Sequence, residues 1–310
     1  MANAPFVVNP TLTAIAIAYM NNEFIADRVL PRVTVGAREF QWTEYNKEDR
    51  FSIPDTLVGR KGQPNVVEFG GTERSGFVQD YGLEDHIPQQ DLDNAQNGYN
   101  NFDPRGNAVE LLSEIIGLDR EKRVAAKVQD KNNYAHKETL SGTDQWDDPA
   151  SKPLVQLVDA LEVPIKRPNV MTISRKSSVT LRRNPSVVKA YHGTVADDGL
   201  VPLEFVRELL EIEEILVGAA YYNSARPGQD MTLDRIWGNH CSLTYRNPNA
   251  RPNRGVTYGF TAEHGQRVSG TREDGNIGLR GGEAIRVGES VDELVICNDV
   301  AYFLENVIAG

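Results

Sequence analysis

The fold is decided by residues 103–134, which read DPRGNAVELLSEIIGLDREKRVAAKVQDKNNY. Asp103 is a strong helix N-cap, because its carboxylate can accept hydrogen bonds from free backbone N–H groups, and Pro104 suits the first helical position. Apolar residues then recur at helical spacing and predict a helix over about 104–133, which is roughly 40 Å long. Gly117 is the weakest point and a candidate for a bend. We expect this long amphipathic helix to lie across a sheet.

The residues before this helix offer little material for a core of their own. Residues 1–37 begin with a loose, proline-containing tail. The apolar residues that follow predict a short helix over 12–19 and a second turn over 25–30. These pieces are apolar, yet the sequence around them provides nothing for them to pack on. We therefore expect them to find their partners elsewhere.

Residues 38–83 have the pattern of an extended hairpin. The first strand is predicted over residues 39–45, with Phe40 and Trp42 on one face, and the return is predicted over 66–69 and 75–81. The segment between them is polar and rich in Gly and Pro. Because a lone two-stranded hairpin is marginal in water, we expect this arm to lie on another surface, most simply on another copy of the chain.

Residues 84–102 are polar and turn-rich and are predicted to be a connector into the long helix. Beyond the helix the pattern alternates between helices and strands. Helices are predicted over residues 153–161, 175–183, 185–191 and about 202–210. Strands are predicted over residues 169–174, about 214–220 and 236–245. A Gly-rich stretch over 247–282 has no predicted element, and the last segment predicts two strands with room for a third. The fold class is α+β.

Composition excludes several classes of protein. The 310 residues carry 33 Lys plus Arg against 44 Asp plus Glu, a net charge of −11, which argues against a free-standing nucleic-acid binder. Cys241 and Cys297 are too few for a disulfide framework and predict buried free thiols in a reducing compartment. We see no signal-peptide pattern, and the apolar run at residues 12–19 is too short to span a bilayer. We expect a soluble cytosolic product.

Catalytic and metal-binding motifs are missing from the sequence. The histidines are scattered, and His240 and Cys241 are adjacent on a predicted strand, so their side chains point to opposite faces. Three aspartates around Trp146 fit no calcium-loop pattern and indicate a turn before a helix. The Gly-rich stretch at 275–282 lacks the context of a phosphate-binding loop. We predict no enzyme, no cofactor and no metal.

Taken in order, the segments resemble the major capsid proteins of tailed bacteriophages, which have the Hong Kong 97-type fold. The strings LTAIAIAY and FIADRVLPRVTV are similar to the family's N-terminal arm, and FSIPDTLVGRKGQ is similar to the tip of its extended loop. DYGLEDHIP is similar to the return into the spine helix. VPLEFVRELLEIEEILVGAAYYN with IWGNHCSLTY is similar to the helix and sheet of the apical domain. The resemblance covers about residues 10–308 and rests on the order of these strings.

That resemblance implies a domain division and a function. The division is an N-terminal arm (1–37), an extended loop (38–83), a peripheral domain with the spine helix (84–162), a mainly apical domain (163–282) and a return through both domains (283–310). The implied function is a structural one, in which subunits form hexamers and pentamers of an icosahedral head. The head encloses double-stranded DNA without sequence-specific binding. We expect the protein in the virion, assembled in the cytoplasm of a host bacterium.

The resemblance also implies partners and contact residues. No long charged helical leader precedes the arm, so a separate scaffolding protein is expected, together with a portal and a decoration protein. Predicted inter-subunit contacts in the extended loop are Trp42, Tyr45, Arg50, Phe51, Arg60, Lys61 and Phe69. Those predicted in the arm are Leu12, Ile15, Ile17, Phe24 and Ile25. Whether Lys61 forms an isopeptide cross-link is left open.

Two alternatives remain at this point. An encapsulin-like nanocompartment shell shares the fold. A soluble α/β enzyme with a spatially assembled site is the rival from another class, and it would need a pocket holding residues such as His240 or Glu84.

Overall fold

The computed structural model describes residues 6–18, 21, 23–45, 52–68, 70–96, 103–193, 198–251 and 255–309. Its helices are α1 (Pro10–Ala18), α2 (Ala26–Val29), α4 (Gln89–Gln96), α5 (Pro104–Val128), α6 (Pro153–Glu162), α7 (Arg175–Arg183), α8 (Pro185–His192) and α9 (Leu203–Leu209). Its strands are β1 (Val7–Val8), β2 (Arg32–Thr34), β3 (Glu39–Tyr45), β4 (Gly71–Phe77), β5 (Gln79–Pro88), β6 (His136–Thr139), β7 (Val170–Ser174), β8 (Glu214–Gly218), β9 (Tyr221–Asn223), β10 (Leu233–Arg235), β11 (Cys241–Thr244), β12 (Gly259–Glu263), β13 (Val268–Asp274), β14 (Gly282–Val295) and β15 (Ala301–Glu305).

Helix α5 begins where the sequence predicts and ends about one turn earlier. The Asp103 carboxylate accepts a hydrogen bond from the backbone N–H of Arg105, at 3.1 Å, so the predicted N-cap is confirmed. The helix stops at Val128, because the Asp130 side chain accepts from the N–H of Asn132 and starts a separate 3-10 turn. A local side-chain acceptor competes with continuation of the helix. The predicted end near residue 133 is therefore wrong.

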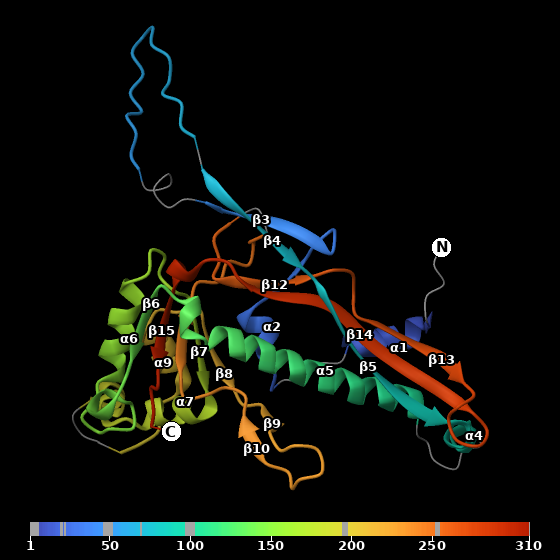
Figure 1. The fold of residues 1–310 in the computed structure, drawn as a ribbon. Helices are drawn as coiled ribbons and strands as arrows, with labels where there is room; N and C mark the ends of the chain where they lie inside the picture. Colours follow the sequence, from blue (N-terminus) through green and yellow to red (C-terminus); the bar gives the residue numbers. More distant parts are fainter. Residues whose placement is uncertain are drawn as a thin grey trace.

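The bend expected at Gly117 is not realised, since α5 runs unbroken through it (Figure 1). The glycine is there for a packing reason. The Phe24 ring lies so close that a Cβ on Gly117 would sit 2.9 Å from one of the ring carbons.

The larger sheet lies along α5. Its order is β1-β13-β14-β12-β2, and β5 pairs antiparallel with the other edge of β14. Helix α5 contacts both β14 and β5, as expected for a helix lying across a sheet (Figure 1). The N-terminal segment closes this layer, because α1 contacts α5 and β13 while β2 pairs with β12. Apolar side chains from α1, α5 and β14 share one core cluster.

The smaller sheet forms a second, compact body at one end of α5 (Figure 1). Its order is β6-β15-β11-β7-β8, and β7 is buried at every position. Helices α6, α7, α8 and α9 supply side chains to a core cluster shared with this sheet. A further cluster, which includes Trp237 and Phe303, joins this body to the C-terminal half of α5. No helix in the described ranges is long and apolar enough to cross a membrane.

Several predicted elements are corrected by the structure. The return strand of the hairpin is β4, while residues 66–68 are in neither helix nor strand. Residues 84–96 are not a connector, because β5 extends to Pro88 and α4 follows directly. The predicted strand over 236–245 shortens to β11.

Strands β12 and β13 fill part of the stretch 247–282 for which no element was predicted. Both pair with β14, so they belong to the larger sheet. Strand β13 escaped the pattern because its buried positions include small residues. At Gly270 a Cβ would lie 2.2 Å from the Phe6 ring, so only glycine leaves room for that ring.

Candidate assembly surfaces

The extended hairpin projects away from both sheets (Figure 1). Strands β3 and β4 pair in a regular antiparallel register from Glu39↔Phe77 to Tyr45↔Gly71. On one face the rings of Phe40 and Trp42 lie 5.8 Å apart, as the alternation predicts, and cover Gly76 on the opposite strand. Aromatic side chains over a strand glycine shield a backbone that has no side chain of its own.

Beyond the strands, residues 52–68 form an irregular loop whose side chains are exposed throughout. Three large apolar side chains face water almost completely: Ile53 is 96% exposed, Leu57 86% and Val66 90%. A tight turn, in which the N–H of Gly62 donates to the carbonyl of Gly59 at 2.8 Å, presents the residues between them at the tip. Three such side chains within one short loop indicate a contact site for another macromolecule.

The structure describes four of the seven residues predicted to make inter-subunit contacts in the extended loop. Trp42 is half-buried at the base of the hairpin, whereas Arg60 and Lys61 are exposed at the turn. Tyr45 lies in β3, where its backbone pairs with Gly71. The remaining predicted loop residues, Arg50, Phe51 and Phe69, lie outside the described residues.

The exposed apolar residues Ile53, Leu57 and Val66 were not among the predicted contacts. Their signal is present in the sequence, since they are large apolar residues in a segment without helical or strand periodicity. A residue of that kind has no local core to enter.

Most of the predicted arm residues pack against their own chain. Leu12 and Ile25 are 4% and 3% exposed and lie in cores formed by their own chain. Ile15 is partly buried in the same way, and Phe24 packs on α5 at Gly117. These side chains therefore pack on distant segments of their own chain, as the absence of a local core requires, and their contact with a neighbouring subunit stays a prediction. Ile17, at 51% exposed, remains open to a neighbour.

Glu121 on α5 fastens the arm to the rest of the molecule. Its carboxylate accepts hydrogen bonds from the backbone N–H groups of Ile25 and Ala26, at 3.0 and 2.8 Å, and from the indole N–H of Trp237 at 2.6 Å. The side chain is fully buried. Burial raises the pKa of Glu121 above its ordinary value, although these donors act in the opposite direction. One carboxylate thus joins α2, α5 and the segment before β11.

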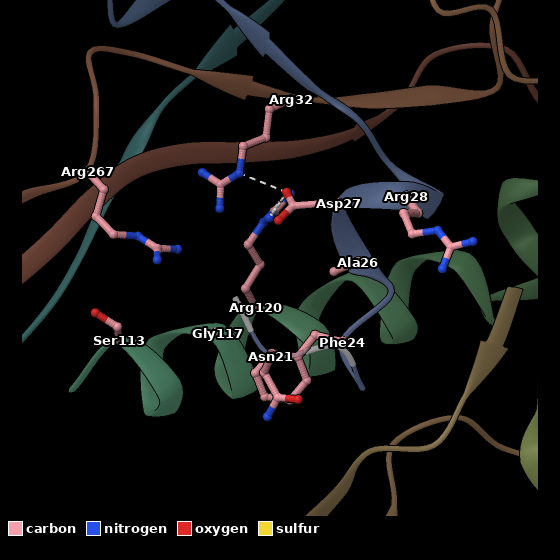
Figure 2. Close-up of a pocket in the computed structure, with 10 residues that line it drawn as sticks. All are labelled: Asn21, Phe24, Ala26, Asp27, Arg28, Arg32, Ser113, Gly117, Arg120 and Arg267. Atoms are coloured by element: carbon pink, nitrogen blue, oxygen red, sulfur yellow. Dashed lines mark hydrogen bonds and ion pairs between the residues drawn. The ribbon is translucent and has the colours of Figure 1, made fainter. Parts of the chain in front are cut away.

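An arginine-lined cavity of about 210 Å³ lies beside this anchor (Figure 2). Asp27 accepts hydrogen bonds from Arg120 and, at 2.8 Å, from Arg32. Burial raises the pKa of Asp27, but the two guanidinium groups outweigh that effect and hold the pKa below its usual range. The carboxylate of the buried Glu289 forms ion pairs with Arg32 and Arg267, at N–O distances of 2.9 and 3.1 Å. These ion pairs tie the arm to the sheet and to α5.

The titratable side chains that the alternative of a soluble enzyme would use are Cys241, Glu84 and His240, and their surroundings are those of structural residues. Burial raises the pKa of the Cys241 thiol far above its ordinary value, which is typical of a structural cysteine. Glu84 lies between Arg286 and Arg272, and burial raises its pKa less than these cations lower it. Burial lowers the pKa of His240. Neither cysteine forms a disulfide bond; Cys241 is buried and Cys297 is half-buried. Among the described residues no group of three or more His, Cys, Asp or Glu side chains is arranged to hold a metal ion.

Comparison with known proteins gives two close relatives by sequence, although no family model matches the chain. The chain is 51% identical over 312 residues to the major capsid protein of Pseudomonas phage JBD67, with 100% of both proteins covered. It is 30% identical over 287 residues to the major capsid protein of Burkholderia phage BcepMu, covering 88% of this chain and 89% of that protein.

Solved structures are similar in fold over nearly the whole chain. A phage-related protein from Bordetella bronchiseptica superposes with a TM-score of 0.76 at 21% identity, covering 98% of this chain and 99% of that one. A virus-like particle from Pyrococcus furiosus gives 0.59 at 13% identity, with 95% and 97% covered. The capsid of cyanophage P-SCSP1u gives 0.52 at 13% identity, with 89% and 86% covered.

Proposed function

The chain belongs to the family of phage major capsid proteins, and from that premise we propose that its copies form the hexamers and pentamers of an icosahedral head enclosing double-stranded DNA. Its mixed helix-and-sheet fold is the Hong Kong 97-type capsid fold. Its role is structural, not enzymatic. Both curated relatives are capsid proteins of phages, which supports this function over an encapsulin-like compartment and over a soluble enzyme.

The observation that carries the assembly proposal is the loop over residues 52–68. Ile53, Leu57 and Val66 are exposed, and within the described residues the loop rests on no second layer. Burying a large apolar side chain is worth about 1.5–3 kcal/mol, so a surface that covers all three is strongly favoured. A neighbouring copy supplies that surface in our proposal. Arg60 and Lys61, together with Trp42 and the predicted residues outside the described ranges, would complete the contact.

The N-terminal arm is a second contact in this proposal, and its residues divide into two groups. Ile17 is available to a neighbouring subunit as the chain stands. Leu12 and Ile25 are already covered by their own chain, so a neighbour would reach them only if that packing opened.

We retain the proposed domain division with one refinement. For the arm, extended loop and peripheral domain we keep the proposed boundaries at residues 37, 83 and 162, the second of which falls within β5. The pairing of β12 and β13 with β14 favours ending the apical domain before β12 instead of at residue 282. A separate scaffolding protein, a portal and a decoration protein are the proposed partners. Assembly is proposed to take place in the cytoplasm of the host bacterium, and the acidic balance suits a wall that holds DNA without binding it tightly.

Deletion of residues 46–64 tests the proposal. The wild-type chain, expressed with its phage neighbours, should form closed particles in electron micrographs and a high mass in light scattering. The deletion removes the tip but leaves both sheets and their cores, so it should give a soluble subunit that forms no closed shells. Normal shells from the deleted chain would contradict the proposed role of the loop.

A further inference from the structure

The cavity between the N-terminal arm and α5 has the chemistry of a ligand site. Figure 2 shows three guanidinium groups that converge on one space from different parts of the fold. Arg32 comes from β2, Arg120 from α5 and Arg267 from the residue before β13. Arg28 points away from this space and pairs with Glu214. Asp27 is the single acidic side chain in the described lining.

These guanidinium groups have hydrogen-bonding capacity to spare. Each carries five N–H donors. Arg32 bonds Asp27, Glu263 and Glu289, and Arg120 bonds Asp27 and the hydroxyl of Thr261. Arg267 donates to Glu289 and to the carbonyl of Ala16, at 3.0 Å. Described partners thus take two or three N–H groups of each arginine. Glu289 does not line the cavity and leaves the space itself to the cations.

Two buried polar atoms of the lining residues make no hydrogen bond within the described residues. They are the hydroxyl of Ser113, whose residue is 1% exposed, and Nε of Arg120, whose residue is 2% exposed. Nε of Arg120 has an ion-pair partner, the carboxylate of Glu293 at 4.0 Å, whereas no partner is found among those residues for the Ser113 hydroxyl. Figure 2 shows Ser113 on α5 at the edge of the cavity, below Arg267. A buried polar atom without a partner costs about 1–3 kcal/mol, so the Ser113 hydroxyl indicates that a further polar group occupies this space.

We propose that this cavity binds a small tetrahedral oxyanion of the inorganic phosphate class, held by Arg32, Arg120, Arg267 and the hydroxyl of Ser113. Its volume of about 210 Å³ holds such an ion with water around it. Its recessed position selects a free ion over the backbone of a DNA duplex. Because the three arginines come from the arm, the helix and the sheet, the bound ion stabilises the packing of all three.

The field at neighbouring carboxylates agrees with this assignment. Burial raises the pKa of Asp27 and of Glu289, yet in each the surrounding arginines prevail and the pKa stays below its ordinary value. The arginines therefore lower the pKa of these two carboxylates by more than burial raises it.

Phosphate titration of the purified full-length chain tests the proposal. Inorganic phosphate should raise the melting temperature progressively, beyond the effect of chloride at equal ionic strength, because a ligand that binds the folded state stabilises it by mass action. Isothermal titration should give an affinity about tenfold weaker for Ser113→Ala, as expected for the loss of one hydrogen bond to a charged group. Arg105→Gln, which alters an ion pair with Glu283 outside the cavity, should leave the affinity unchanged.

A carboxylate introduced at position 113 distinguishes a cavity with an excess of positive charge from a cavity whose charges cancel. Ser113→Asp should abolish the response to phosphate and, without phosphate, melt at a higher temperature than the uncharged Ser113→Asn. The opposite order of melting temperatures would overturn the proposal, and so would equal responses to phosphate and chloride. A short DNA duplex at the same phosphate concentration should have no effect on the titration. Displacement of phosphate by the duplex would overturn the assignment to a free ion.

Discussion

The carboxylate of Glu121 is the buried acceptor that fastens the arm to α5. Replacing it by alanine leaves three buried donors without a partner: two backbone N–H groups at Ile25 and Ala26, and the indole N–H of Trp237. Each orphaned donor costs about 1–3 kcal/mol, so we expect Glu121→Ala to lower the free energy of unfolding by at least about 3 kcal/mol. Urea denaturation of the unassembled subunit measures this.

The control for Glu121 is an acid on the same helix that faces solvent. Glu110→Ala should change the free energy of unfolding by less than about 0.5 kcal/mol, as surface substitutions usually do. Equal effects from the two variants would show that the anchor at Glu121 does not hold the arm.

The folded-state pKa of Glu289 is lowered, whereas that of Glu121 is raised, so the two carboxyl groups make the stability depend on pH in opposite senses. Burial raises the pKa of Glu289, but Arg32, Arg267 and Arg120 keep it below the ordinary value of about 4.3. A lowered folded-state pKa contributes stability that is present above the unfolded pKa and is lost as the pH falls through the folded one. At pH 7, Glu289→Gln should cost about 3–5 kcal/mol, because the largely buried Arg32 and Arg267 each lose an ion-pair partner.

The difference between wild type and Glu289→Gln should therefore shrink as the pH falls below the unfolded-state value of about 4.3, because the unfolded chain then takes up a proton that the folded chain excludes. An exposed acid provides the comparison. Glu110→Gln should show a small difference from wild type at both pH values. A Glu289→Gln difference that stays constant from pH 7 to pH 3 would contradict the ion-pair account.

At the scale of elements, α5 and α2 are fitted to each other through Gly117 and Phe24. Alanine is favoured over glycine inside a helix by about 1 kcal/mol, yet a Cβ at Gly117 would meet the Phe24 ring at 2.9 Å. We expect Gly117→Ala to destabilise the subunit by about 1–3 kcal/mol in denaturant unfolding, since overpacking displaces the ring. In a Phe24→Ala background the same change should stabilise instead. A stabilising effect in both backgrounds would rule out the packing explanation.

Elements with strong local signals could be predicted from the sequence. Asp103 and Pro104 fix the start of α5, and the predicted helix over 175–183 has the bounds of α7. The elements that were missed depend on distant partners. Strand β13 is polar and contains Gly270, and it is recognisable as a strand only beside β14 and under the Phe6 ring. Helix α4 has one buried side chain, Leu92, so its sequence has no apolar stripe.

At the scale of the whole molecule, the same limit applies to the contact surfaces. The arm was predicted to lack a local core because its partners on α5 and β13 lie about 100 and 250 residues further along the chain. Packing between segments so far apart leaves no local pattern. The loop over 52–68 was predicted to be an extended contact from its irregular composition, and its exposure agrees with that, although the apolar residues that carry the argument were passed over for charged and aromatic ones.

Substitutions in the exposed loop should affect assembly of the shell without affecting the stability of the isolated subunit. Ile53, Leu57 and Val66 touch little of their own chain, so changing all three to serine should alter the free energy of unfolding of the subunit by less than about 0.5 kcal/mol. The same triple variant should yield no closed particles in electron micrographs, because the buried area that would favour association is removed. Thr56→Ala with Gln63→Ala changes polar residues of the same loop and should leave shells intact. Shells of normal size and yield from the triple variant would mean that the loop tip is not covered by a neighbouring subunit.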